Sequence, residues 1–168
     1  MKMIHIYHGD GKGKTTASVG IAIRALGADK KVVFSQFLKS DSSCEIKVLD
    51  KLLDVKICKN KHGFFPQLND KEKAEVIKEQ NDLFSILEDT TCLDLLIMDE
   101  ILDAVYLNII DEKKLIDFLI KKRETTEIIL TGRNPSDDIL NLADYITYFK
   151  KEKHPFDSGT GARLGIEY

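Results

Sequence analysis

The sequence predicts an α/β fold of three layers, in which a mostly parallel central sheet has helices on both faces. Three observations predict it. Short apolar runs alternate with helical patterns along the 168 residues, as in chains that build parallel sheets. Residues 93–98 form a nearly continuous apolar run, typical of a strand buried on both faces. A glycine-rich segment, residues 9–16, directly follows the first apolar run.

The predicted strands are short runs rich in Val, Ile, Leu and aromatic residues. They span residues 3–7, 31–36, 55–58, 93–98, 127–130 and 145–149. No repeat, linker or low-complexity segment divides the chain, and its length is near the usual size of one domain. We therefore expect residues 1–168 to form a single domain.

Helices are expected between these strands. The first covers residues 14–26 and is apolar almost all round, as a helix packed on a sheet is, and Gly27 is expected to end it. Residues 45–53 are expected to form the second helix. Residues 59–68 lack periodicity and contain Gly and Pro, so they are predicted to be a loop.

The third predicted helix begins at Asn69, because Asn69 with Glu72 three residues later has the pattern of a capping box. Its expected apolar face consists of Val76, Ile77, Leu83, Phe84 and Leu87. A further helix is predicted over residues 111–122. A last, short helix is predicted to start with Asn134 as its cap and Pro135 in its first turn.

Residues 9–16 have the pattern of a phosphate-binding loop that opens a helix. The nucleotide-binding candidates are Gly9, Asp10, Gly11, Lys12, Gly13, Lys14, Thr15 and Thr16. In such a loop, backbone N–H groups point at the anion, the lysine reaches the terminal phosphates, and the following hydroxyl binds Mg²⁺. The spacing departs from G-x-x-x-x-G-K-[ST], because His8 occupies the first glycine position. A lysine-rich turn is the alternative, but the strand before and the helix after favour a P-loop NTPase-like domain that binds a nucleoside triphosphate.

Two further strand ends carry candidate site residues. Asp99 and Glu100 close the apolar run over 93–98, which brings a carboxylate to the edge of the sheet where the glycine-rich loop lies. Either carboxylate could hold Mg²⁺ with Thr15 and the phosphates. Arg133 follows the strand over 127–130, and its guanidinium could bind phosphate oxygens. A surface arginine is nearly as common at such a position.

Charge and composition limit the other partners. The formal net charge is −3, so no basic field points to nucleic acid. No apolar stretch approaches the ~18 residues of a membrane span, and the start of the chain leaves no room for a signal peptide before the first strand. Cys44, Cys58 and Cys92 lack C-x-x-C spacing, which favours free thiols in a cytoplasmic protein.

The chain resembles the P-loop ATP:cob(I)alamin (corrinoid) adenosyltransferases over nearly its whole length. The most distinctive motifs are the loop G-D-G-K-G-K-T-T and the tail K-H-P-F-x-x-G-x-x-A-R-x-G-I-E-Y, which begins at Lys153. Shorter matches lie at residues 24–27, 36–39, 45, 63–64, 98–100, 130–133 and 143–144.

This resemblance implies transfer of the 5′-deoxyadenosyl group from ATP to a reduced corrinoid, with release of triphosphate. Co(I) is itself the nucleophile, so the protein must align the reactants and neutralise the leaving group. Lys14, Arg133 and Mg²⁺ would do the latter. The resemblance also implies a homodimer and an electron-donating reductase or flavoprotein as partners.

The corrinoid would need a broad apolar or aromatic surface beside the nucleotide. Phe64 and Phe65 are the candidates, although two phenylalanines in a loop are often simple packing. The family commonly has G-F-T-W where this chain has Gly63, Phe64, Phe65 and Pro66, and the chain contains no tryptophan. The group that crowds the corrin face would then be Phe64 or Phe65.

Two other functions remain open on the sequence. The same loop could belong to a small-molecule or nucleoside kinase, although no clear lid segment with arginines is present. The chain could also be a non-catalytic ATP-binding paralogue, a possibility that the missing tryptophan raises.

Overall fold

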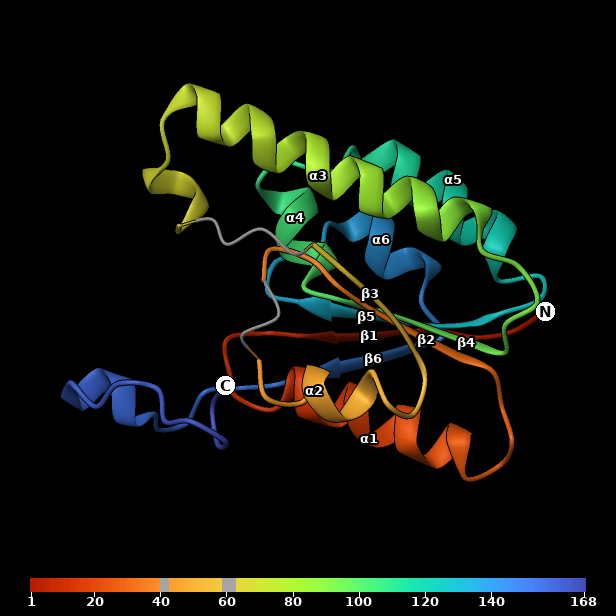
Figure 1. Ribbon diagram of the computed structural model, residues 1–168, viewed down its shortest axis with the longest axis horizontal. Coiled ribbons are helices and arrows are strands. Elements are labelled where there is room, and N and C mark those ends of the chain that lie inside the picture. The colour runs from red at the N-terminus through yellow and green to blue at the C-terminus, as the bar shows by residue number, and fades with distance from the viewer. Residues whose placement is uncertain (40–42, 59–62) are drawn as a thin grey trace.

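The central sheet of the computed structural model has six strands, and every pairing between neighbours is parallel. The structure describes residues 1–39, 43–58 and 63–168. The strand order is β3-β2-β4-β5-β1-β6, and Figure 1 shows the strands running between two layers of helices. The strands are β1 (Ile4–His8), β2 (Val32–Gln36), β3 (Asp54–Ile57), β4 (Leu95–Asp99), β5 (Glu127–Gly132) and β6 (Tyr145–Tyr148).

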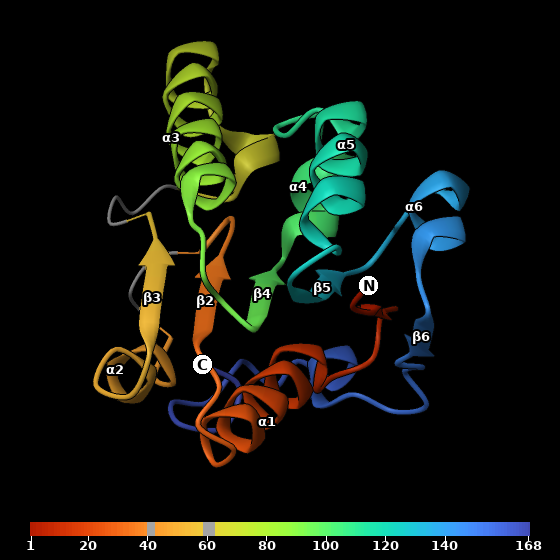
Figure 2. The same cartoon turned by 90° about the vertical axis from the view of Figure 1, so that its right-hand side faces the viewer.

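Helices cover both faces of this sheet, so the predicted three-layer α/β architecture is confirmed (Figure 2). On one face lie α1 (Lys14–Leu26) and α2 (Ile46–Leu49). On the other lie α3 (Asp70–Asp89), α4 (Ile101–Tyr106), α5 (Glu112–Lys122) and α6 (Asp137–Leu142). Two short 3₁₀ helices, η1 (Phe65–Gln67) and η2 (Pro155–Ser158), lie in the connecting and C-terminal segments.

The core consists of two apolar clusters, one on each face of the sheet. All residues of β2 and β4 are buried, as the apolar run over 93–98 predicted. The larger cluster contains Phe84 and Phe118, whose rings pack edge to face with centroids 5.2 Å apart. The two clusters together bury the central strands, whose carboxyl ends carry the candidate site.

Helix α3 begins as predicted, with Asn69 accepting from the backbone N–H of Glu72 while the Glu72 side chain accepts from that of Asn69. The predicted apolar face is wrong at Ile77, which is exposed. Gln80 is buried at this face instead, with 2% of its surface exposed. Its carboxamide contacts the turn after β2, a polar role that an apolar pattern cannot reveal.

Two predicted helix boundaries are wrong. The helix expected over 45–53 is only α2, because the chain turns after it to enter β3 at Asp54. The last short helix does not start at Asn134 and Pro135; Ser136 caps it, accepting from the backbone N–H of Ile139 at 3.3 Å. The predicted loop over 59–68 lies partly outside the described residues, and its described part contains η1.

Helix α4 was not predicted at all. It follows β4 after a single residue, Glu100, whose φ of 61° lies in the left-handed region. A left-handed residue between a strand and a helix is normally Gly or Asn. Because Glu stands here instead, no turn signal marks the start of α4 in the sequence. At the neighbouring strand end, a Cβ on Gly132 would lie 2.5 Å from the Cβ of Leu102 in α4. The absence of a side chain there lets α4 pack directly against β5.

Candidate functional site

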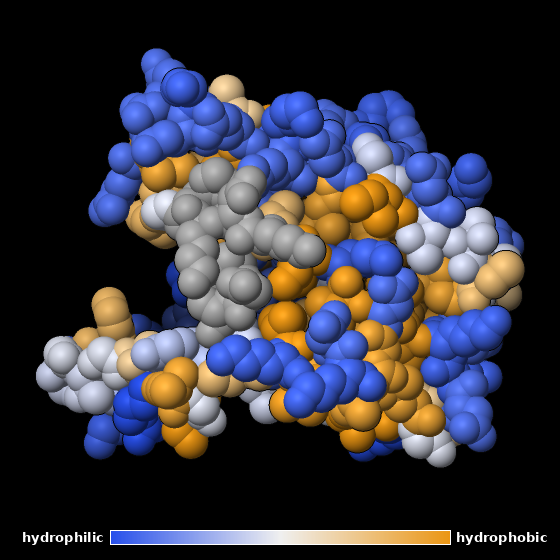
Figure 3. Space-filling model, viewed as in Figure 1, coloured by the Kyte–Doolittle hydropathy of each residue, from blue (hydrophilic) through white to orange (hydrophobic). Residues whose placement is uncertain are grey.

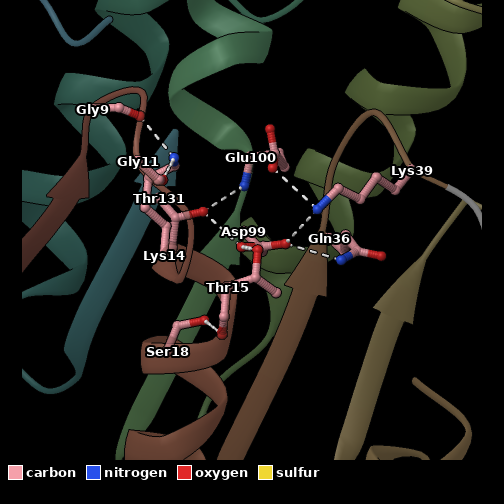
Figure 4. Close-up of polar contacts among 10 residues, drawn as sticks. All are labelled: Gly9, Gly11, Lys14, Thr15, Ser18, Gln36, Lys39, Asp99, Glu100 and Thr131. Carbon is pink, nitrogen blue, oxygen red and sulfur yellow. Dashed lines mark hydrogen bonds and ion pairs between the residues drawn. The ribbon is translucent and has the colours of Figure 1, made fainter. Parts of the chain in front are cut away.

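The glycine-rich loop joins β1 to α1 at the carboxyl edge of the sheet, as predicted. Gly9 and Gly13 have φ values of 113° and 111°, which only glycine adopts without strain. The Lys14 ammonium curls back into the loop and donates to the carbonyl oxygens of Gly9 at 2.7 Å and Gly11 at 2.9 Å (Figure 4). Burial lowers the pKa of Lys14, an effect that the Glu100 carboxylate opposes. The lysine therefore occupies the hollow that the loop encloses.

Two of the glycines also have a packing role that the sequence did not reveal. A Cβ on Gly9 would lie 2.5 Å from the carbonyl oxygen of Phe149, and one on Gly11 would lie 2.6 Å from it. The backbone N–H of Gly11 donates to this same oxygen at 2.7 Å. The loop is thus held against the chain that leaves β6, and side chains at these two positions would push it away.

Asp99 is the centre of the polar network at the end of β4 (Figure 4). Its carboxylate is completely buried. The Thr15 hydroxyl donates to Oδ1 at 2.9 Å, and the Thr131 hydroxyl donates to the same oxygen at 2.6 Å. Gln36 donates to Oδ2 at 2.9 Å. The structure therefore joins the predicted residues Thr15 and Asp99 directly.

Gln36 and Thr131 are polar residues of this network to which sequence analysis gave no role. Each stands near the carboxyl end of a mostly apolar strand, β2 and β5. A buried polar residue at such a position has to find a hydrogen-bond partner. That signal was present in the sequence, but only the strand order brings both side chains beside Asp99.

Glu100 lies beside Asp99 but points to different partners. Its backbone N–H donates to the Thr131 hydroxyl at 2.9 Å, and its carboxylate Oε1 lies 3.1 Å from the Lys39 ammonium. Burial acts to raise the pKa of Glu100, but the Lys39 charge overcomes it and the pKa lies below its usual range. Burial raises the pKa of Asp103 to about 7, with a further contribution from its hydrogen bond to Glu100.

Two of the pockets at this edge of the sheet share a wall. The first, here called the loop pocket, has a volume of about 340 Å³ and is lined by residues 10–16 and by the C-terminal segment. The second, the aromatic pocket, has about 380 Å³ and is lined by Phe64, Phe65 and Tyr106 among others. Lys39, Glu100 and Arg133 line both. In Figure 3 a hollow separates the C-terminal segment, at the lower left, from the part of the molecule above it.

The C-terminal segment is tied to the glycine-rich loop by charge. The Lys12 ammonium donates to Glu167 at 3.2 Å, and Arg163 donates to the same carboxylate through Nε, Nη2 and its backbone N–H. These hydrogen bonds, chiefly those of Arg163, lower the pKa of Glu167 to about 2. The tail motif thus forms one side of the loop pocket, a placement that the sequence could not give.

The remaining predicted residues lie at the rim of the pockets. Phe64 exposes 69% of its surface, whereas Phe65 is half-buried and packs against the larger core cluster. Arg133 is exposed where the two pockets meet. Asp10 is exposed on the loop and accepts from the backbone N–H of Lys151 at 3.2 Å. Thr16 is exposed near the start of α1.

The donor set at the end of β4 suits a hard divalent cation. The Thr15 hydroxyl and the Asp99 carboxylate already meet, and Mg²⁺ prefers such oxygen ligands, completed by water and phosphate. Among the described residues there is no group of three or more His, Cys, Asp and Glu that could hold a metal alone. The three cysteines are free, as predicted. Within the described part of the chain, no helix is long and apolar enough to cross a membrane.

Comparisons with known proteins agree on one family. A family model described as ATP:corrinoid adenosyltransferase BtuR/CobO/CobP matches residues 1–168. The corrinoid adenosyltransferase of Escherichia coli K12 is 30% identical over 168 residues, covering 99% of this chain and 85% of the relative. That of Salmonella typhimurium shows the same identity and coverage.

A more distant relative and a solved structure extend the comparison. The corrinoid adenosyltransferase of a Sinorhizobium species is 27% identical over 172 residues, covering 99% of this chain and 80% of the relative. Among solved structures, ATPases 2 and 3 of EssC from Geobacillus thermodenitrificans match with a TM-score of 0.50 at 15% identity. The match covers 99% of this chain and 36% of that one. This last likeness is one of fold alone and supports the P-loop-like architecture.

Proposed function

The chain belongs to the ATP:corrinoid adenosyltransferase family, and on that premise we propose that it transfers the 5′-deoxyadenosyl group of ATP to Co(I) of a reduced corrinoid. The cobalt–carbon bond forms as the bond between C5′ and the triphosphate oxygen breaks, and the electron pair leaves with the triphosphate. One observation carries the proposal: the loop pocket and the aromatic pocket share Lys39, Glu100 and Arg133 on their common wall. Two different substrates can therefore meet there.

The glycine-rich loop would bind the triphosphate. Its backbone N–H groups and the start of α1 favour an anion. Lys14 would exchange the carbonyl oxygens of Gly9 and Gly11 for phosphate oxygens, because two neutral acceptors compete poorly with a charged one. Arg133, at the rim, would stabilise the charge that develops on the leaving triphosphate. No serine, cysteine or general base is required, since the cobalt is the nucleophile.

Mg²⁺ is part of this proposal, with Thr15 and Asp99 as its protein partners. Their direct hydrogen bond puts a hydroxyl and a carboxylate of the right chemistry together beside the loop. The ion would supply positive charge that neutralises the triphosphate. Glu100 is the alternative partner, because it lines both pockets and carries a lowered pKa.

The corrinoid would lie in the aromatic pocket, with Phe64 and Phe65 against its ring. The high exposure of Phe64 supports this, because it leaves most of the ring face available to a ligand. Crowding of the lower corrin face by one of these rings would expel the axial ligand and make Co(II) easier to reduce. An electron-donating reductase or flavoprotein would supply the electron.

The assembly and location complete the proposal. We expect a homodimer, a hypothesis supported by β6, an edge strand whose Tyr145, Ile146 and Tyr148 each expose more than half of their surface. We expect residues 1–168 to act as one nucleotide-binding domain. A cytoplasmic location suits the free cysteines, which need a reducing compartment.

The test is an anaerobic incubation of the protein with ATP, Mg²⁺ and chemically reduced cob(I)alamin, followed by absorption spectroscopy and analysis of the nucleotide products. We expect the spectrum of a carbon–cobalt product together with free triphosphate. ADP and a phosphorylated acceptor would identify a kinase instead. Normal ATP binding without corrinoid-dependent turnover would identify a non-catalytic paralogue.

A further inference from the structure

Lys39 is the residue at the junction of the two pockets whose role the family assignment leaves open. Its ammonium lies 3.1 Å from Oε1 of Glu100 and 3.6 Å from Oδ2 of Asp99 (Figure 4). Burial tends to lower the pKa of Lys39, but the two carboxylates overcome it and the pKa is raised. One cation thus stands between the two carboxylates that are candidates for a metal.

The turn after β2 holds Lys39 in this place. The backbone N–H of Phe37 donates to the Asp99 carbonyl oxygen at 2.9 Å, and the Phe37 side chain is completely buried. Leu38 has a φ of 59°, a strained value for a branched side chain. Buried Gln80 stabilises that conformation, because its Oε1 accepts from the Leu38 N–H at 3.2 Å. The structure therefore directs the Lys39 side chain back over the end of β4.

An ammonium and a divalent cation compete for the same oxygens at this place. Asp99 Oδ1 accepts from the hydroxyls of Thr15 and Thr131, and Oδ2 accepts from Gln36, so no oxygen of this carboxylate is without a donor. The carboxylate oxygens nearest the Lys39 ammonium are Oδ2 of Asp99 and Oε1 of Glu100. A divalent cation held by Thr15 and Asp99 lies close to the Lys39 ammonium, and repulsion between the two positive charges separates Lys39 from at least one of these oxygens. The displaced ammonium remains beside the loop pocket, which Lys39 lines.

We propose that Lys39 is the counter-cation of Asp99 and Glu100 in the nucleotide-free protein, and that its ammonium moves to the triphosphate when Mg²⁺–ATP binds. This inference rests on the proposed function, since it needs a nucleotide and a divalent cation at this site. It gives Lys39 two effects. In the absence of nucleotide Lys39 opposes metal binding, and in the presence of the metal it favours triphosphate binding. Metal and nucleotide would then bind cooperatively, because the triphosphate gains the Lys39 ammonium only when the metal displaces it from the carboxylates, and the metal displaces it more easily when the triphosphate can accept it.

The experiment uses Mn²⁺ as a spectroscopic substitute for Mg²⁺. Free Mn²⁺ is counted by electron paramagnetic resonance in titrations of wild-type protein, Lys39→Met and Lys39→Arg, and ATP affinity is measured by calorimetry at saturating Mn²⁺. Lys30→Met is the matched control, because Lys30 forms a comparable ion pair with Asp94, 3.7 Å apart, at the opposite end of the strands. Thermal unfolding of each variant verifies that it is folded, and Lys39→Gln provides a second neutral variant.

We expect Lys39→Met to bind Mn²⁺ about tenfold more tightly than wild type without nucleotide, and to bind ATP at least about tenfold more weakly, the strength of one charge-assisted hydrogen bond. Lys39→Arg and Lys30→Met should remain near wild type in Mn²⁺ binding. A purely structural role for Lys39 would weaken both affinities together.

Two results would overturn the inference. If Lys39→Met and Lys39→Gln bind Mn²⁺ no more tightly than Lys30→Met, the ammonium does not occupy the cation position. If their ATP affinity equals that of wild type, the ammonium does not move to the triphosphate. A wild-type protein that binds no Mn²⁺–ATP would instead contradict the proposed function itself, which separates the two failures.

Discussion

The sharpest prediction concerns Phe64 and Phe65, which the structure places in different surroundings. Phe64 exposes 69% of its surface beside the aromatic pocket. Full burial of a phenylalanine side chain is worth about 1.5–3 kcal/mol, so a corrinoid that covers the exposed two thirds would gain about 1–2 kcal/mol from it. Phe64→Ala should therefore raise the Kd for the corrinoid about 5- to 30-fold. The folded state should lose less than about 1 kcal/mol, since only the remaining third is already buried.

Phe65→Ala is the comparison variant. Phe65 is half-buried and packs against the larger core cluster, so its truncation should cost roughly 2 kcal/mol of folding free energy, about half the value for a fully buried phenylalanine. Corrinoid binding is measured by calorimetry, folding by chemical denaturation, and turnover from both Co(II) and Co(I). The ring that crowds the corrin face should matter more in turnover from Co(II), because only that reaction requires loss of the lower axial ligand.

Three results would refute this reasoning. Unchanged corrinoid binding in both variants would mean that the corrinoid lies elsewhere. An equal loss of turnover from Co(II) and Co(I) would mean that the ring only packs against the ligand. A change in ATP affinity as large as the change in corrinoid affinity would mean that the two pockets do not separate the substrates.

Other predictions concern the polar side of the site. Lys14→Ala should reduce turnover at least ~100-fold, because it removes a positioned charge from the leaving triphosphate, while thermal unfolding stays near that of wild type; near-normal turnover would exclude the role. Asp99→Asn should raise the Mg²⁺ concentration needed for half-maximal turnover at least ~10-fold, whereas Glu100→Gln should change this concentration little. If neither variant changes it, Thr15 would be the only predicted metal partner left. Asp103 has a pKa of about 7 in the folded protein, whereas an ordinary aspartate, as in the unfolded chain, has a pKa of 3.8. Between these values the folded state holds a proton that the unfolded state has lost, so the free energy of unfolding of metal-free protein should fall as pH rises from about 4 to about 7. Asp103→Asn should flatten this slope in denaturation measurements, and an unchanged slope would assign it to other groups.

Local chemistry explains which parts of the fold could be predicted. The capping box at Asn69 and Glu72 is a contact within one turn, so the sequence pattern contains it completely. The run over 93–98 is apolar because both faces of β4 are covered. Both features depend on neighbours along the chain or on burial alone, and both were predicted.

The features that escaped prediction depend on contacts between distant segments. Glu100 has a left-handed φ, and its backbone N–H donates to Thr131, 31 positions away along the chain. Gln80 is buried because it contacts the turn at Leu38. A helical apolar pattern assigned that face to Ile77 instead. The first contact depends on the pairing of β4 with β5, and the second depends on the packing of α3 beside the end of β2.

The residues of the candidate site also fall into those that the sequence could predict and those that it could not. The glycine-rich loop and the carboxylates at the end of β4 were identified because strand ends and glycine spacing are visible in the sequence. The link of Lys12 to Glu167 and the place of Lys39 were not, because both join segments that only the fold brings together. The family resemblance had included the distinctive tail and the shorter match at residues 36–39 without giving either a physical role.

The central claim is that C5′ of ATP becomes bonded to cobalt while the triphosphate leaves intact. The most direct test is a single turnover with ATP labelled with ¹³C at C5′, Mg²⁺ and cob(I)alamin without oxygen, followed by NMR of the corrinoid and quantification of phosphate products. We expect the label to be bound to cobalt and triphosphate to be released in equal amount. Label that stays in a nucleotide, with ADP as the product, would contradict it.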